Sequence, residues 1–122
     1  MADTPEGRVK KNIKERLEKL GILNAGHKNW VVRVVFRVAC TGWYYMPTQN
    51  GMGVAGIPDF IGHYKGRFWS IEAKARGKTP NPNQVERGKE IRESGAVHFV
   101  MDDPDMQFIE FERWCRSIDK DL

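Results

Sequence analysis

The first apolar positions of the chain recur with the period of a helix. Val9, Ile13, Leu17 and Leu20 are separated by four, four and three residues, so they share one face of a helix predicted over residues 5–20. The flanking residues agree with these bounds, because they supply an N-cap, a first-turn proline and a terminating glycine: Thr4 or Asp3, Pro5 and Gly21.

The middle of the chain has no single period. Residues 30–39 are rich in valine, which favours a strand, although Arg33 and Arg37 lie one helical turn apart and leave a helix as the alternative. The stretch WYYMPT at 43–48 predicts another short strand. The segment 49–56 has three glycines in eight residues and is predicted to be a loop.

Two strands joined by a tight turn are predicted next. The segments 58–64 (PDFIGHY) and 67–75 (RFWSIEAKA) flank a Lys-Gly pair, whose glycine tolerates the positive φ that a hairpin turn needs. Side chains alternate faces along a strand, so one face of the second strand should be apolar and pack on a helix. The other face carries Phe68, Ser70, Glu72 and Lys74.

The last third of the chain predicts a helix, a strand and a helix. Asn81 and a following proline open a helix that runs to about Ser94, and 96–101 (AVHFVM) is a short apolar strand. Asp103 and Pro104 then open a final helix with four apolar residues on one face: Phe108, Phe111, Cys115 and Ile118.

This order of elements predicts the fold class. Helix, strands, hairpin, helix, strand and helix together make an α/β sandwich, in which helices flank a small mixed sheet. The 122 residues suffice for one core, so residues 1–122 are expected to form a single domain.

Charge and apolar content limit the classes of partner that the chain is expected to bind. There are 20 Lys and Arg against 16 Asp and Glu, a net charge of +4 that leans toward a polyanion. We expect no membrane partner and a cytoplasmic location, because no apolar run reaches bilayer length and the N-terminus does not resemble a signal peptide. The two cysteines, Cys40 and Cys115, are expected to be reduced thiols.

The hairpin carries the candidate chemistry. Antiparallel pairing brings Asp59 opposite the neighbourhood of residues 72–74, so two carboxylates and the ammonium of Lys74 converge near the glycine loop. Two close carboxylates repel, and a divalent cation relieves that repulsion. Mg²⁺ prefers such oxygen ligands and suits phosphodiester hydrolysis. The alternative is a salt-bridge ladder of Asp59, Lys74 and Glu72 without catalytic meaning.

A resemblance to a known family enters at these residues. PD at 58–59, followed at thirteen residues by EAK at 72–74, resembles the core of PD-(D/E)XK nucleases. The wider pattern of GIPDF, GRFWSIEAKARGKTPNPNQ and GAVHFV resembles the VRR-NUC branch, including its stand-alone phage members, over residues 43–102 and the first helix. The family implies a restriction-endonuclease-like three-layer sandwich. If the chain is phage-encoded, the location is the host cytoplasm.

The resemblance also implies roles for individual residues. The family's metal ligands fall on Asp59, Glu72 and the backbone carbonyl of Ala73, and its catalytic lysine on Lys74. The implied cofactor is Mg²⁺ or Mn²⁺. Two further family positions fall on Glu6 and Gln84, each with a simpler explanation: an acid in the first turn of a helix, and the far half of a capping box begun by Asn81.

One stretch departs from the family pattern. Compact relatives pass from the first helix almost directly to a strand, whereas here residues 24–42 intervene. We interpret this stretch as an added element, either a strand or a dimer contact. Its arginines are expected to lie on the surface.

The expected activity is metal-dependent cleavage of DNA. The products implied by the family carry 5′-phosphate and 3′-hydroxyl ends. We expect a homodimer that prefers branched or four-way-junction DNA. The alternatives are a monomer that cuts flaps or single strands, a nuclease-like module that binds nucleic acid without cutting it, and RNA as substrate. Stacking on an unpaired base is conceivable for three aromatic residues, although core packing is expected for at least two of them: Trp43, Tyr44 and Tyr45.

Overall fold

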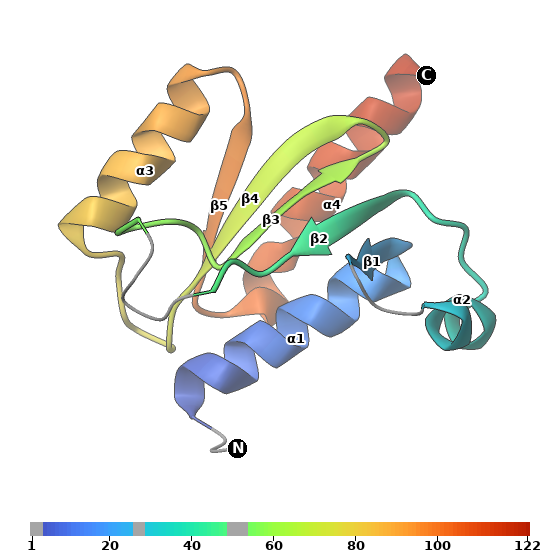
Figure 1. The fold of residues 1–122 in the computed structure, drawn as a ribbon, viewed down its shortest axis with the longest axis horizontal. Helices are drawn as coiled ribbons and strands as arrows, with labels where there is room; N and C mark the ends of the chain where they lie inside the picture. The colour runs from blue at the N-terminus through green and yellow to red at the C-terminus, as the bar shows by residue number, and fades with distance from the viewer. Residues whose placement is uncertain (1–3, 26–28, 49–53) are drawn as a thin grey trace.

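The computed structural model describes residues 4–25, 29–48 and 54–122. Within these ranges the chain forms helices and strands in the order shown in Figure 1. The bounds are α1 Pro5–Lys19, β1 Ile22–Asn24, α2 Trp30–Phe36, β2 Gly42–Tyr45, β3 Phe60–Tyr64, β4 Arg67–Ala73, α3 Pro82–Glu93, β5 Val97–Met101 and α4 Pro104–Asp121.

The strands form one mixed sheet. Its order is β1-β2-β3-β4-β5, with parallel pairs at both edges and antiparallel pairs in the middle. The predicted α/β class with a small mixed sheet and flanking helices is therefore confirmed.

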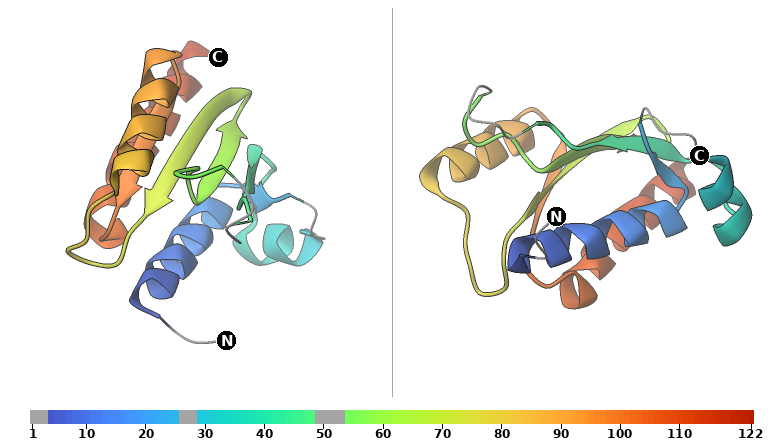
Figure 2. Two further views of the ribbon diagram at one scale, coloured as in Figure 1. Left: turned by 60° about the vertical axis from the view of Figure 1, so that its left-hand side comes forward. Right: turned by 60° about the horizontal axis from the view of Figure 1, so that its bottom comes forward.

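One face of the sheet packs on α1 and α4. Figure 2 shows both helices beneath the strands in its right-hand view. The apolar stripe predicted for each helix is buried there, and Trp69 and Ile71 of β4 contribute from the sheet. The ring of Phe111 meets those of Trp69 and Phe99 edge to face, with centroids 5.1 and 5.4 Å apart. This layer is the hydrophobic core.

The opposite face is covered by α3 at one edge. Gly88 of α3 lies so close to β5 that a Cβ atom there would stand 2.9 Å from Cδ2 of His98. His98 is buried, and its Nδ1 lies 2.7 Å from the Oγ atom of Ser70 on β4. Over β2 and β3, no helix of the described chain covers this face (Figure 2).

The hairpin between β3 and β4 forms as predicted. Phe60 pairs with Ile71 and Tyr64 with Arg67, across a turn of two residues. Both turn residues have positive φ, 48° for Lys65 and 85° for Gly66, which is the signature of a type I′ turn.

The segment 30–39 contradicts the predicted strand. Residues Trp30–Phe36 form the helix α2, which ends at Arg37 in the left-handed conformation with φ 54°. The reason is tertiary. The preceding strand β1, which the apolar pattern did not reveal, pairs in parallel with β2, and parallel neighbours need a crossover connection. The helix α2 lies on that crossover.

The other predicted elements are confirmed to within a few residues at their ends. Thr4 caps α1 by accepting a hydrogen bond from the Gly7 N–H at 2.9 Å. Gly21 and Gly95 follow their helices with φ of 83° and 94°. In the described part of the chain, no helix combines the length and the apolar character needed to cross a bilayer.

Candidate active site

The two predicted carboxylates lie side by side at one end of the hairpin. The register of β3 and β4 places Asp59, just before β3, opposite Glu72 near the end of β4. Asp59 is 7% exposed, and its Oδ2 atom accepts a hydrogen bond from the Ala73 N–H at 2.9 Å. The strand pairing therefore holds a buried acid at the position that the sequence predicted.

Glu72 is the more deeply buried acid, with 2% of its surface exposed. Its Oε2 atom accepts a hydrogen bond from Nε2 of Gln84 at 2.8 Å. Its Oε1 atom is buried and has no hydrogen-bond partner in the described part of the chain. Burial raises the pKa of Glu72 to about 9, and side-chain interaction with Asp59 adds to the effect.

Gln84 forms the capping box that the sequence offered as its simpler explanation, and it also contacts two predicted site residues, whereas its role in function stays a prediction. In the capping box at the start of α3, its N–H donates to Asn81 Oδ1 and its Oε1 accepts from the Asn81 N–H, each at 2.9 Å. The same Oε1 atom accepts from Nζ of Lys74 at 3.2 Å. The first turn of α3 therefore fixes an amide that contacts both Glu72 and Lys74.

A lysine that the sequence did not single out completes the cluster. Nζ of Lys10 lies 3.2 Å from Oε2 of Glu6 and 3.3 Å from Oδ1 of Asp59. Burial opposes its charge, but Asp59 and Glu6 outweigh that effect and raise the pKa of Lys10. Its only sequence signal is the i,i+4 spacing from Glu6, which is common on helix surfaces.

The predicted site residues thus meet in one polar cluster drawn from α1, the hairpin and α3. Glu6 reaches Asp59 through Lys10, whereas Asp59, Glu72, Lys74 and Gln84 gather at the end of β4. We call this set the carboxylate cluster: Glu6, Lys10, Asp59, Glu72, Lys74 and Gln84.

The carboxylate cluster fits a hard divalent cation by the chemistry of its donors. Within the residues described, no group of three or more His, Cys, Asp or Glu side chains is arranged to hold a metal ion. Mg²⁺ usually takes only one or two carboxylates and fills its remaining positions with water and phosphate oxygens. The unpartnered Oε1 atom of Glu72 is a donor of this kind. A carbonyl contribution from Ala73 stays a prediction.

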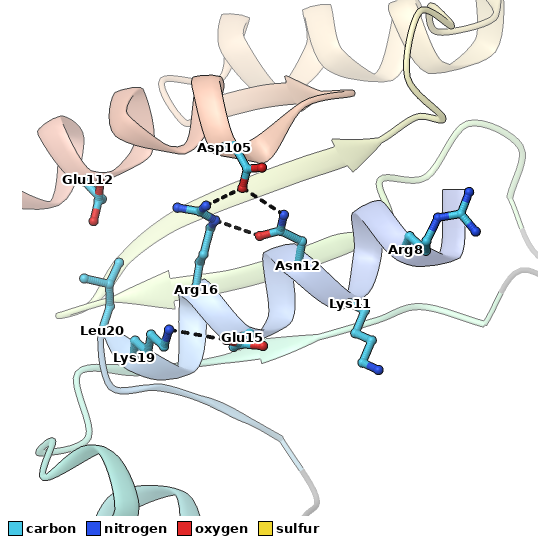
Figure 3. A pocket seen from close by; sticks show the side chains of 9 residues that line it. All are labelled: Arg8, Lys11, Asn12, Glu15, Arg16, Lys19, Leu20, Asp105 and Glu112. Carbon is cyan, nitrogen blue, oxygen red and sulfur yellow. Dashed lines mark hydrogen bonds and ion pairs between the residues drawn. The ribbon is translucent and has the colours of Figure 1, made fainter. Parts of the chain in front are cut away.

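A second charged surface lies between α1 and α4 (Figure 3). This groove of about 640 Å³ contains bases and acids that largely pair with one another. Arg16 and Asn12 bind Oδ1 of Asp105, and Lys19 pairs with Glu15. Figure 3 shows Arg8 and Lys11 pointing away from Asp105. The contacts of Arg16 and Asn12 with Asp105 therefore hold α1 and α4 together. The acidic side chains of the groove would repel a phosphate group, so the groove is a poor phosphate site.

The prediction that at least two of the three aromatic residues of β2 pack in the core is wrong. Tyr44 alone is buried, and its hydroxyl donates to Oε2 of Glu18 at 2.8 Å. Trp43 and Tyr45 are 54% and 52% exposed, because strand alternation turns both away from α1 and α4.

Comparisons with models of protein families, with curated proteins and with solved structures give no match. The function must therefore be inferred from the site itself.

Proposed function

We propose that this chain is a metal-dependent DNA endonuclease of the PD-(D/E)XK superfamily, of VRR-NUC type, with a restriction-endonuclease-like sheet. One observation carries the proposal. Two buried carboxylates lie side by side at one end of the hairpin. One of them keeps an oxygen without a hydrogen-bond partner in the described part of the chain, and an amide links that acid to the ammonium of Lys74. A salt-bridge ladder does not require burial of an unpartnered carboxylate oxygen, which is costly.

The metal would be Mg²⁺ or Mn²⁺, held by Asp59 and Glu72 with the carbonyl of Ala73. When bound, such an ion polarises a phosphoryl oxygen and lowers the pKa of water. The chain's own groups would orient the reaction. The Ala73 N–H holds Asp59 in place, and the Gln84 amide holds both Glu72 and Lys74.

Lys74 would act on the phosphate. Its ammonium is partly exposed at the end of β4 and is tethered on one side by Oε1 of Gln84. A positive charge held at this place stabilises the negative charge that develops on a phosphate oxygen during in-line attack. Lysine suits this role as a compact point charge with three donors.

The residues around the site support nucleic acid as the class of substrate. Exposed basic residues near the cluster, in the loop 76–80 and on α3, would contact flanking phosphates, which gives affinity that falls with salt and depends little on sequence. Branched or junction DNA and a homodimer remain part of the proposal.

A cleavage assay on plasmid, single-stranded and branched DNA, with Mg²⁺ or Mn²⁺, tests the function. We expect Lys74→Ala to lower the cleavage rate at least about a hundredfold, since removal of one charge-stabilising group typically has that effect. DNA affinity, measured in EDTA, should change little. Lys120→Ala is the matched control, because Lys120 is an exposed lysine near the end of α4, by the hairpin turn and away from the carboxylate cluster.

Near wild-type cleavage by Lys74→Ala would remove the hairpin from the chemistry. If wild-type protein binds DNA but cuts none of the three substrates with either metal, the chain is instead a binding module with a nuclease-like arrangement.

A further inference from the structure

Three large aromatic side chains are exposed on the open face of the sheet. Trp43 and Tyr45 of β2 and Phe68 of β4 are 54%, 52% and 45% exposed. Several exposed rings on one face of a sheet are unusual where that face has no partner, and such patches mark binding surfaces. We call the open face formed by these residues, with Ile61 and His63, the aromatic face.

The aromatic face follows from the strand register. Tyr45 pairs with Ile61, and Ile61 pairs with Ser70, which makes one row across three strands. His63 pairs with Phe68 in the next row, and the same register places Trp43 beside His63. Each ring thus projects from a strand whose backbone is hydrogen-bonded in the sheet, so little conformational freedom remains to be lost on binding.

The rows end at the carboxylate cluster. Along β4 the same face carries Phe68, Ser70 and then Glu72, so the row of Tyr45 is one step, about 7 Å, from the row of Glu72 and Asp59. The face is hollowed by about 300 Å³ between Trp43 and Phe68. None of the described residues lining this hollow is acidic.

These properties of the aromatic face favour a strand of unpaired DNA as its ligand. Such a strand offers flat bases and a negative backbone. Rings stack on bases whatever their sequence, and a surface without carboxylates does not repel phosphates. In duplex DNA the base faces are already stacked, so only its backbone would meet these rings. A nucleotide stacked on Tyr45 would place its neighbouring phosphate within reach of the carboxylate cluster.

We propose that the aromatic face binds unpaired nucleotides of a DNA strand, with Trp43 and Tyr45 as stacking platforms beside the carboxylate cluster. This inference rests on the proposed nuclease function for its meaning, but the binding itself needs neither metal nor cleavage.

The test is fluorescence anisotropy in EDTA with a labelled oligo(dT) of about 12 nucleotides, a length within the range of known single-strand sites. Trp43→Ala and Tyr45→Ala should each weaken binding about tenfold, and the double variant about a hundredfold, from the loss of ring–base stacking. Trp43→Phe should stay within about threefold of wild type, because a ring remains.

The controls separate stacking from charge and folding. Affinity for a blunt duplex should be unchanged in Trp43→Ala, as should the dependence of binding on salt, because no charge is lost. Ile109→Ala removes an apolar side chain of similar exposure, 45%, on α4, and should bind like wild type. Thermal melting checks that each variant is folded.

Unchanged oligo(dT) affinity in the double variant would overturn the inference, as would an equal loss on duplex. A fall from dimeric to monomeric mass in Trp43→Ala would also overturn it, because a second copy of the chain would then be the occupant. Failure of the nuclease proposal has a separate signature, namely normal cleavage by Lys74→Ala.

Discussion

Glu72 is a carboxyl group that the fold holds in a costly environment. Its pKa is raised by burial and by Asp59, so the folded chain keeps a proton that the unfolded chain releases above the ordinary value of about 4.5. The folded state therefore binds more protons in this pH range, and its unfolding free energy falls as pH rises.

Glu72→Gln should remove that penalty in metal-free buffer. We expect the variant to exceed wild type in unfolding free energy by on the order of 1–3 kcal/mol at pH 8 and by less at pH 5. Asp59→Asn should act in the same direction more weakly, because it also loses the ion pair with Lys10. Urea unfolding at both pH values measures this, with Glu86→Gln, an exposed acid of α3, as control.

The same two variants should bind Mn²⁺ more weakly, since an amide offers one neutral oxygen in place of a carboxylate. Calorimetric titration gives the affinities, and unchanged values in both variants would remove the metal role from these residues.

Most residues of the carboxylate cluster could be predicted from the sequence. Asp59, Glu72 and Lys74 were predicted from strand alternation across a short turn, which leaves few possible registers. Lys10 was not, because its contact with Asp59 depends on how α1 crosses the end of the sheet. Helical periodicity shows which face of α1 is buried, but not which strand end that face meets.

The contact between α3 and β5 depends on one glycine. Gly88 faces His98, whose pKa burial lowers to about 4, with the charge of Arg92 adding to the effect. Gly88→Ala should lower the unfolding free energy by about 1–3 kcal/mol despite the better helix propensity of alanine, because the new Cβ atom must displace the ring or the helix.

Movement of α3 would also displace Gln84 from Glu72, so cleavage by Gly88→Ala should fall as well. Glu86→Ala, at an exposed acidic position of the same helix, is the control for both measurements. A variant as stable as wild type would show that the two elements separate without cost.

The elements also show where local pattern fails. Four of the seven residues of the helix α2 are valine, and its form follows from the crossover between β1 and β2 rather than from propensity. The three residues of β1 are too few to display a period. Where an element is long or carries caps at both ends, as α1 and α3 do, the sequence was sufficient.

For the whole molecule, self-association stays a prediction. Val34 and Val35 of α2, on the crossover that follows the edge strand β1, are 67% and 66% exposed. A symmetric contact through α2 would bury these side chains and give the expected homodimer with two active sites. Light scattering at micromolar concentration should then report twice the mass of the chain.

The variant Val34→Glu/Val35→Glu should shift that mass toward the monomer, because like charges would meet across the symmetry axis. Met106→Glu, at an apolar position of α4 that is 73% exposed, should not. A monomeric wild-type mass, with equal cleavage of junction and linear duplex, would contradict both the dimer and the preference for branched DNA.

The two ends of the hairpin lie beside different termini of the chain, which matters for the placement of a tag or a fused protein. Asp119, near the end of α4, accepts hydrogen bonds from the Tyr64 hydroxyl and from Nζ of Lys65, so the C-terminal helix is fastened to the turn. Asp59 and Glu72 lie at the other end of the same strands, beside the start of α1. A tag, surface linker or fused protein joined after residue 122 would leave the carboxylate cluster clear, whereas the same cargo joined before α1 would crowd it.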